Sequence, residues 1–334
     1  MKRFIYLGYY FYKMDWSKHN RFISYVSRNT SRSRISLFVS SILNSLWYNI
    51  SILEYYQFHF YEIPNNLKSN YAGTGFMFEY QKLMNPEKFR KFFLEKHLFL
   101  FTFKKFIEHN YVSLHDLGNL DLKLNEILAN SSKKFVLKSN MGQCGIGIEV
   151  LDTAHYDSTS IIERMKRSGN DLAEEFIVQH NELMRLSPSG LNTIRIFTQL
   201  NKKNEVDIIG CRLRISVNSV VDNLAAGNIA AFIDEQSGRV VGPGVYSDIT
   251  REAVQNHPVT GVELDGFQIP FWNETINMIK EAALVVPECK SIGWDIAITN
   301  FGPELLEGNH DWCKLVWQLP AQRGLKHMLI KYLD

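Results

Sequence analysis

The strongest constraint on the fold is a change of pattern at about residue 133. Before it, glycines are few, and Ile35–Tyr61 carries apolar residues at mixed spacings of three and four, which predicts helix. After it, short apolar runs are separated by turn-forming segments, which predicts strands. The sequence therefore indicates an α+β fold with a helical, aromatic-rich N-terminal region.

The expected elements follow one another closely along the chain. Strands are expected at Lys133–Lys138, Ile146–Leu151, Glu174–Gln179, Leu191–Leu200, Val206–Val217, Ile229–Ile233, Arg239–Val245, Ser291–Thr299 and Glu304–Gly308. One or two helices are expected over Pro86–Asn110, and single helices at Ser158–Arg167 and Phe271–Val286. Asn85 is expected to cap the helix that begins at Pro86, because proline is favoured at the first helical position.

Composition and charge exclude several classes of protein. The 334 residues are enough for a sizeable core, and 37 basic against 35 acidic residues favour neither nucleic acid nor a membrane. No nucleic-acid motif occurs. Phe4–Tyr12 is apolar but too short to span a bilayer, and it lacks a cleavage site. A cytoplasmic protein with four reduced cysteines is expected, because no C-x-x-C pair and no cluster with zinc-ligand spacing occurs.

Basic residues gather in one N-terminal segment. Between Lys18 and Arg34 there are five basic residues and no acidic one. One interpretation is a solvated helix face or loop, and the other is a patch that contacts the inner face of a membrane. The sequence alone leaves both open.

A lysine and a glycine-rich loop lie between the first two expected strands. Lys138 ends the first strand, and Gly142, Gly145 and Gly147 follow it. Glycines let backbone N–H groups approach phosphate oxygens, and the lysine ammonium can neutralise phosphate charge. The segment is not a Walker A motif, because G-x-x-x-x-G-K-[ST] is absent, and it is not a dinucleotide fingerprint, because a strand and not a helix follows the loop. It indicates a lid over phosphates, with an ordinary hairpin as the alternative.

Acidic residues converge on the last expected hairpin. Glu307 and Asn309 are two residues apart and share one face of a strand. If Asn300–Pro303 forms the turn, Asp295 lies opposite Glu307. Two such carboxylates repel each other unless a cation lies between them, and Mg²⁺ accepts carboxylate and amide oxygens as ligands. The segment indicates a site for metal-bound nucleotide, with a solvent-facing hairpin of scattered acids as the alternative.

Two weaker patterns lie between these segments. Glu174–Val178 predicts a strand whose free backbone edge could pair with an adenine ring, and Glu182 could bind ribose hydroxyls, although a plain strand and turn would look the same. Arg195, Arg212 and Arg214 lie on expected strands, and the last two share a face. Arginine forks suit phosphate and carboxylate oxygens, with partnered surface arginines as the alternative. No G-x-S-x-G nucleophile elbow occurs.

Taken in order, these segments resemble an ATP-grasp enzyme, and more closely the sugar-transfer-associated ATP-grasp family. The resemblance is carried by FVLKSNMGQCGIGI, EEFIVQH, LNTIRIFT, VVDN followed by AAGN, EQSGRV, HPVTG with GFQIPFW, and GWDIAITNFGPELLEGNHDW. It implies an ATP-grasp fold in which two α+β subdomains clamp ATP. The implied division is a helical N-terminal region at 1–85, a first subdomain with the lid at 86–178, and a second subdomain with the metal site at 179–334.

The resemblance also implies roles for the residues that match the family's motifs. Nucleotide contacts are implied for Lys96, Lys138, Gly142, Gly145, Gly147, Glu174, Glu175, Ile177 and Glu182, the last at the ribose. Asp295, Glu307 and Asn309 would hold Mg²⁺, and Arg195 and Arg214 would steady the transferred phosphoryl group or the acyl intermediate. Two positions depart from the family's pattern: Ser139 stands where proline is common, and Asn228 stands where a second glycine is common.

Three functions are compatible with this resemblance. The first is an ATP- and Mg²⁺-dependent carboxylate–amine ligase that works through an acyl phosphate and joins a sugar or uronic acid to an amino compound in cell-surface polysaccharide, or capsule, biosynthesis. The second is an ATP-dependent phosphotransferase acting on a sugar, and the third is a non-catalytic nucleotide-binding partner of glycosyltransferases. The intact set Asp295, Glu307 and Asn309 favours an enzyme over the third. The basic N-terminal segment would then contact a membrane or a glycosyltransferase.

Overall fold

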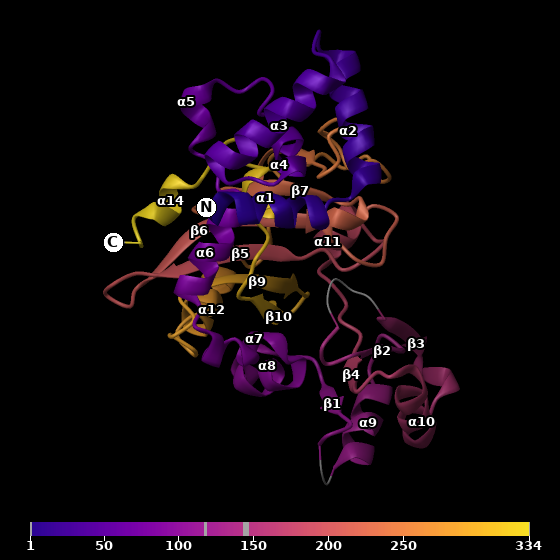
Figure 1. Ribbon diagram of the computed structural model, residues 1–334. Helices are drawn as coiled ribbons and strands as arrows, with labels where there is room; N and C mark the ends of the chain where they lie inside the picture. The colour runs from indigo at the N-terminus through magenta and orange to yellow at the C-terminus, as the bar shows by residue number, and fades with distance from the viewer. Residues whose placement is uncertain (1, 117–118, 143–146, 334) are drawn as a thin grey trace.

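Two antiparallel sheets and the helices that cover them make up the fold. The computed structural model describes residues 2–116, 119–142 and 147–333, coloured along the chain in Figure 1. Within these ranges the strands form a four-stranded sheet of order β1-β4-β2-β3 and a six-stranded sheet of order β10-β9-β5-β6-β7-β8. The expected α+β class with a helical N-terminal region is confirmed.

The small sheet is built from short strands. It contains β1 (Tyr111–Ser113), β2 (Lys134–Lys138), β3 (Glu149–Asp152) and β4 (Leu172–Glu175), covered by helices α9 (Leu120–Leu128) and α10 (Ser158–Ser168). Phe135 and Leu137 are fully buried on the face that the two helices cover. Because side chains alternate along a strand, Lys138 and Glu174 lie on the other face.

The large sheet holds most of the apolar core. Its strands are β5 (Ile194–Leu200), β6 (Val206–Ile215), β7 (Ile229–Ile233), β8 (Val240–Val245), β9 (Ser291–Ile298) and β10 (Pro303–Asn309). Helix α12 (Trp272–Ala282) packs on the face where Ile194, Leu213 and Ile296 are fully buried. The opposite face carries the arginines of β5 and β6, and part of it is covered through Trp312 and Trp317.

The first six helices of the described chain form its N-terminal region. They are α1 (Lys2–Tyr12), α2 (Trp16–Asn29), α3 (Arg34–Tyr48), α4 (Ile52–Gln57), α5 (Asn65–Lys68) and α6 (Thr74–Met84). The helix expected over Ile35–Tyr61 is divided in two. Asn49 adopts a left-handed conformation with φ of 56° and ends α3, and Ser51 and Glu54 then form a capping box that starts α4.

The segment expected to form one or two helices at Pro86–Asn110 is broken into short pieces. They are the 3₁₀ turns η1 (Glu87–Phe89) and η2 (Lys104–Phe106) and the helices α7 (Lys91–Leu94) and α8 (Lys96–Thr102). Phe99 and Phe103 are buried in the core of the large sheet. Helices in proteins are stabilised mostly by tertiary contacts. Burial of these aromatic side chains therefore stabilises the broken arrangement more than one continuous helix would be stabilised by its own backbone.

Several expected strands are shorter than the sequence predicts. Beyond β4, Gln179 makes only an isolated bridge to Thr299, and the strand expected from Leu191 begins at Ile194. The strand expected at Ile146–Leu151 is β3, and Ile146 lies outside the described residues. The remaining short elements are α11 (Asn181–Leu186), α13 (Lys314–Gln318), α14 (His327–Ile330), η3 (Thr153–His155) and η4 (Leu224–Ala226).

Each sheet has its own core. The core of the small sheet runs from Val112 to Ala173, whereas Phe99, Phe103 and Phe106 pack with the large sheet. The division of the chain at residues 86 and 178 stays a prediction.

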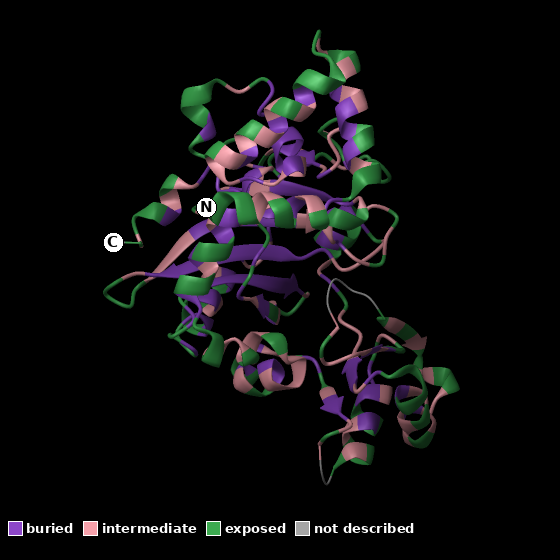
Figure 2. Cartoon of the chain, in the orientation of Figure 1, coloured by how far each residue is buried: buried purple, intermediate pink, exposed green. Residues whose placement is uncertain are grey.

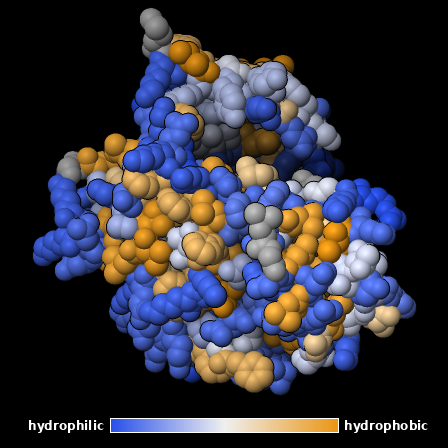
Figure 3. All heavy atoms as spheres, turned by 90° about the horizontal axis from the view of Figure 1, so that it is seen from below, coloured by the Kyte–Doolittle hydropathy of each residue, from blue (hydrophilic) through white to orange (hydrophobic). Residues whose placement is uncertain are grey.

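Burial is concentrated in the strands. Figure 2 shows the strands of the large sheet as buried and the outer turns of the helices as exposed, and every residue of β5 and β9 is buried. Seen from below, on the side of the small sheet, apolar patches are broken up by hydrophilic side chains (Figure 3). None of the helices in residues 2–116, 119–142 and 147–333 combines the length and apolar character needed to cross a membrane.

Asn85 does not cap the segment that begins at Pro86, and it ends α6 instead. Its buried side-chain amide donates to the carbonyl oxygens of Ser291 and His310, at 2.8 and 2.6 Å, and accepts from the Ser291 N–H at 3.0 Å. The sequence predicted a local side-chain cap, but the amide instead bonds to the backbone of Ser291, where β9 begins, and of His310, just after β10.

We predict that Asn85→Ala lowers the free energy of unfolding by about 2–3 kcal/mol, because it leaves buried backbone groups without partners. Urea unfolding followed by circular dichroism would measure the loss. As a control, Asn20→Ala, at an exposed position of α2, should change stability by less than about 0.5 kcal/mol. Equal effects of the two substitutions would contradict the assigned role of Asn85.

Candidate active site

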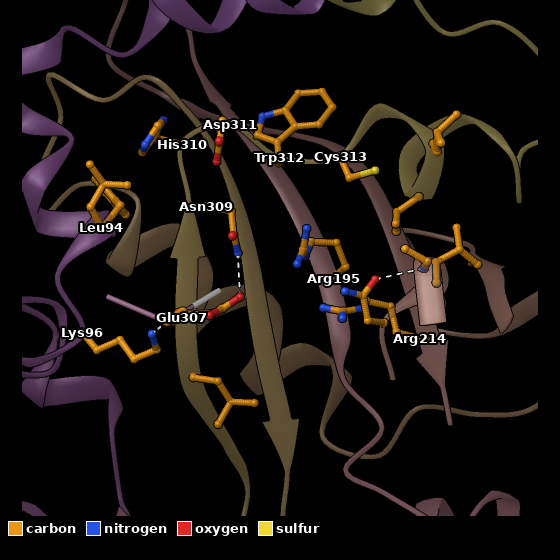
Figure 4. A pocket seen from close by; sticks show the side chains of 18 of the residues that line it. Leu94, Lys96, Arg195, Arg214, Glu307, Asn309, His310, Asp311, Trp312 and Cys313 are labelled. Carbon is orange, nitrogen blue, oxygen red and sulfur yellow. Dashed lines mark hydrogen bonds between the residues drawn. The ribbon is translucent and has the colours of Figure 1, made fainter. Parts of the chain in front are cut away.

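A cavity of about 400 Å³ lies between the large sheet, helices α7 and α8 and the loop after β2 (Figure 4). Residues predicted from the sequence line it, namely Lys96, Lys138, Gly142, Arg195, Arg214, Glu307 and Asn309. In Figure 4, Lys96 and Glu307 lie on one side of the cavity and Arg195 and Arg214 on the other. The cavity thus brings together residues from the lid, α8 and three strands of the large sheet.

A row of charged side chains crosses the sheet at this cavity. The register pairs Glu307 of β10 with Asp295 of β9. Asp295 is paired in turn with Arg195 of β5, and Arg195 with Arg212 of β6. A bulge at Leu306 shifts β10 by one residue, and Glu307 faces Asp295 as a result of that shift. The cross-strand position of Asp295 and Glu307 expected from the sequence is confirmed.

Asp295 is the charged centre of this row. It is buried, with 3% of its surface exposed, and its carboxylate accepts hydrogen bonds from Nε and Nη2 of Arg195 and from Nη1 of Arg214. The Nη2 and Nη1 contacts measure 2.7 and 2.9 Å. Burial opposes ionisation, but the two guanidinium groups outweigh it and hold the pKa of Asp295 below its usual range. The carboxylate therefore fixes both arginines.

Arg214 is held from a second side by Asp222. Its Nη2 atom lies 2.7 Å from Oδ1 of Asp222, and the other oxygen of that carboxylate, Oδ2, accepts from the Thr193 N–H at 2.9 Å. Burial would lower the pKa of Arg214, but the carboxylates of Asp222 and Asp295 raise it above its usual range. Asp222 belongs to the VVDN segment. This segment is part of the family resemblance, but the sequence did not indicate a function for Asp222.

Asn228, one of the two departures from the family's pattern, has a structural role. Its buried amide accepts from the Val217 N–H at 2.8 Å and donates to the carbonyl oxygens of Val221 and Asn223 at 2.7 and 3.1 Å. These bonds fix the loop that carries Asp222. Asparagine at this position therefore holds the loop in place and indirectly supports Arg214.

Glu307 and Asn309 face the cavity from β10. Asn309 Nδ2 donates to Glu307 Oε1 at 3.1 Å. Glu307 is open to the cavity, yet the protein around it and the nearby Asp295 carboxylate raise its pKa. A cation beside the two carboxylates would relieve that repulsion.

The magnesium role expected for Asp295, Glu307 and Asn309 stays a prediction. Glu307 and Asn309 line the cavity, whereas Asp295 is not among its lining residues and both of its oxygens accept from arginines. The described residues contain no group of three or more His, Cys, Asp and Glu side chains that could hold a metal. Asp295, Glu307 and Asn309 instead offer two carboxylates and one amide. Mg²⁺ is usually held by one or two carboxylates together with phosphates and water, so a small protein set is sufficient.

Lys96 ties helix α8 to the start of the glycine-rich loop. Its ammonium donates to the carbonyl oxygens of Ser139 and Asn140 at 3.0 and 3.3 Å, and to that of Gly142. Burial and the charge of Lys138 lower the pKa of Lys96. Ser139, the other departure, contributes only its backbone oxygen to this contact.

The lid itself is described only in part. Gly142 lines the cavity, and Gly147 has a φ of 78°, in the left-handed region that favours glycine. Gly145 lies outside the described residues. The predicted role of the lid glycines at the phosphates therefore stays a prediction.

A buried chain of charges connects the two sheets. Lys138 Nζ lies 2.6 Å from Glu174 Oε2, and the same oxygen is 3.7 Å from Nε2 of His109. On its other side, Nδ1 of His109 is 2.8 Å from Oε2 of Glu304, which belongs to β10. Burial disfavours charge on His109, but Glu174 and Glu304 raise its pKa to about 9, and Lys138 and His109 lower that of Glu174 to about 2.

Five predicted nucleotide contacts among the described residues are not part of the cavity lining. They are Gly147, Glu174, Glu175, Ile177 and Glu182. Glu174 turns towards Lys138, and Glu175 accepts from the Asn110 N–H and side-chain amide at 3.3 and 3.2 Å. Glu182 is exposed on α11 and pairs with Arg185 at 2.7 Å. Their proposed contacts with the nucleotide stay predictions.

The sequence did not identify two residues of the site, and it predicted too exposed a position for a third. His109 carries no motif, because its partners Glu174 and Glu304 are far away in the sequence. Lys18 of α2 lines the cavity, although the sequence placed it only in a basic surface segment. Arg212 shares a face with Arg214 as expected, but it is fully buried and donates to the Trp317 carbonyl oxygen at 3.0 Å, and burial lowers its pKa to about 10.

The chain belongs to the sugar-transfer associated ATP-grasp family, whose family model matches residues 76–332. The ATP-grasp fold expected from the sequence is thereby confirmed. No curated protein matches the chain.

Several solved structures are similar in fold at low identity. N5-carboxyaminoimidazole ribonucleotide synthetase in its ADP complex shows 13% identity and a TM-score of 0.39, over 65% of this chain and 45% of that one. D-alanine–D-alanine ligase from Bacillus anthracis shows 11% identity and a TM-score of 0.40, over 72% and 66%. The ATP-grasp ligase PsnB with precursor peptide PsnA2 and AMPPNP shows 12% identity and a TM-score of 0.44, over 78% of this chain and 65% of that one. The chain thus spans less than half of the first of these proteins.

We predict that His109 makes the protein less stable at alkaline pH. Its pKa in the folded protein is about 9, against an ordinary value of 6.5. The contribution of His109 to the free energy of unfolding is therefore complete below pH 6.5 and is lost as the pH rises through 9. The full contribution is on the order of 3 kcal/mol. Denaturant unfolding at about pH 6, 8 and 10 would measure it.

Two substitutions isolate this effect. His109→Gln should flatten the decline in stability between neutral and alkaline pH, whereas His155→Gln, at an exposed position, should keep the decline of the original protein. The assignment fails if both variants keep the full decline.

Proposed function

We propose that this protein is an ATP- and Mg²⁺-dependent ligase that joins a carboxylate to an amine through an acyl phosphate. The observation that carries the proposal is the cavity, where Lys96, Lys138, two arginines and the Glu307–Asn309 pair line one space. Phosphoryl transfer requires mainly positioning of the reactants and neutralisation of charge, and these side chains supply both.

Lys96 and Lys138 would hold the phosphates of ATP. Both line the cavity, and the pKa of Lys96 is lowered by burial and by its neighbour, so an anion between the two would relieve their repulsion. Lys138 would exchange its contact with Glu174 for a phosphate oxygen, and His109 would remain to balance the charge of Glu174. The adenine would bind the backbone that follows β4, at Glu175–Ile177, as the family's motif implies.

Asp295, Glu307 and Asn309 would hold Mg²⁺, which supplies neutralisation of phosphate charge when bound. Arg195 and Arg214 would face the transferred phosphoryl group and the acyl intermediate. Because Asp295 and Asp222 fix both guanidinium groups beforehand, little reorganisation is needed when charge develops.

The proposed reaction has two steps. A carboxylate oxygen of the substrate attacks the γ-phosphorus of ATP, the bond to the bridging oxygen breaks, and ADP leaves with that electron pair. The amine then attacks the acyl carbon, loses a proton, and displaces phosphate. The acyl phosphate needs no nucleophile from the protein, because the substrate itself supplies both attacking atoms.

The proposed substrates are a sugar or uronic acid and an amino compound, joined during assembly of a cell-surface polysaccharide or capsule. The description of the family as sugar-transfer associated supports this choice. A glycosyltransferase is the proposed protein partner, and the cytoplasm is the proposed location. The basic segment between Lys18 and Arg34 is the proposed contact with a glycosyltransferase or with the inner face of the membrane.

The direct test incubates the protein with ATP, Mg²⁺, uronic acids and amino acids, and measures ADP and phosphate. ADP with free phosphate only when both substrates are present supports the ligase. ADP with a phosphorylated sugar and no need for an amine would identify a phosphotransferase instead. Tight ATP binding without turnover for any pair would favour a non-catalytic nucleotide-binding protein.

We predict that Glu307→Gln lowers turnover by about 10²–10³-fold, the effect of losing one preorganised charge at a transition state. Because Glu307 is open to the cavity, the substitution should leave the fold intact, as checked by circular dichroism. Glu126→Gln, at an exposed position of α9, is the matched control and should keep full turnover. Full turnover of Glu307→Gln would remove Glu307 from the proposed metal site.

A further inference from the structure

Helix α3 packs Leu37, Phe38 and Ile42 inward and presents a second set of apolar side chains to the outside of the molecule. Ile35, Val39, Leu43 and Trp47 follow one another at intervals of four residues, so they form one stripe along the helix. They are 79%, 48%, 52% and 71% exposed. Figures 1 and 2 show α3 at the end of the molecule away from the small sheet, with part of its surface exposed.

The inner side of the same helix is partly polar. Ser41 and Ser45 are buried, and their hydroxyl groups donate to the carbonyl oxygens of Phe38 and Ile50, each at 2.7 Å. A helix on the surface of a water-soluble protein normally keeps its apolar residues inside and its polar residues outside. No charged residue occurs between Arg34 and Glu54 to keep the outer stripe in water. The stripe therefore needs a partner.

Helix α1 lies beside α3 and extends this apolar surface. Nη1 of Arg3 donates to the carbonyl oxygens of Leu46 and Trp47 at 2.9 and 2.7 Å, which joins the start of α1 to the end of α3. Phe4 and Tyr12 of α1 are 68% and 81% exposed. Exposed aromatic side chains of this kind are typical of proteins that lie in the interfacial region of a bilayer.

The charge around this surface selects the kind of partner. Residues 2–53 contain eight basic residues and a single acidic one, Asp15. Lys2 and Arg21 are paired with carboxylates of other elements. Among the described residues, no carboxylate lies within ion-pair distance of the others, which include Lys13, Arg28 and Arg34. An apolar stripe next to unpaired positive charge is complementary to anionic lipid.

We propose that the outer face of α3, together with the exposed side chains of α1, docks on an anionic lipid bilayer. Ile35, Val39, Leu43 and Trp47 enter the boundary between headgroups and acyl chains, and the basic residues contact the headgroups. The helix lies on the membrane and does not cross it. This inference is independent of the ligase chemistry, because it concerns a surface formed by residues that precede the matched family region.

The test measures co-sedimentation of the full chain with vesicles of phosphatidylcholine alone and of phosphatidylcholine with phosphatidylglycerol, without ATP. We expect binding to the anionic vesicles, weaker binding to the neutral ones, and loss of binding as salt screens the basic residues. No binding to anionic vesicles, or equal binding to both kinds at all salt concentrations, would overturn the proposal.

Variants test the assigned residues. The combined substitution Val39→Ser, Leu43→Ser and Trp47→Ser should weaken vesicle binding by about tenfold or more, because it removes most of the inserted apolar surface. All three positions are exposed, so the fold should survive, as circular dichroism would show. The matched control is Phe301→Ser, which changes a side chain that is 99% exposed on the β9–β10 turn and should leave binding unchanged.

Two further measurements separate the lipid from other occupants. Lys13→Gln with Arg34→Gln should weaken binding to anionic vesicles while leaving binding to neutral ones unchanged. Sedimentation velocity without vesicles should show the same monomer for the original chain and the triple variant. A dimer that the triple variant loses would assign the face to a second copy of the chain and overturn the lipid proposal. ATP binding, measured on the same samples, tests the proposed enzyme separately.

Discussion

The buried contact of Asp295 with Arg195 and Arg214 is the interaction on which the rest of the structure depends. Three charged side chains in the middle of a sheet are tolerable because each neutralises another, and removal of one would leave an uncompensated charge. The same contact aims both arginines at the cavity and places Glu307 beside a carboxylate. A structural requirement of the sheet and a requirement of phosphoryl transfer therefore fall on the same residues.

A second set of charges links the two sheets. His109 lies between Glu174 of the small sheet and Glu304 of the large one, and Lys138 completes the chain at the cavity. In the proposed function a nucleotide phosphate competes with Glu174 for Lys138. Nucleotide binding would therefore change a contact next to the buried link between the sheets.

The sequence predicted the hairpin and the pairing of Asp295 with Glu307, but strand periodicity did not reveal the bulge at Leu306 that produces this pairing. The helices after Pro86 were predicted less well. The sequence there favours long helices, but burial of Phe99 and Phe103 in the core of the large sheet accompanies a division into short pieces. His109 could not be predicted, because its partners come from distant strands. The apolar spacing of α3 predicts a helix, but only the fold reveals which side of it faces outward.

The bulge at Leu306 limits how this hairpin can change in evolution. A regular ladder continuing from the Leu305–Ile296 pair would place the apolar Leu306 opposite Asp295, and the extra residue of the bulge brings Glu307 there instead. Loss of Leu306 would remove the bulge and still leave Glu307 opposite Asp295. Homologous chains that lack the bulge should therefore also lack one residue of β10, because only then does the glutamate stay opposite the aspartate.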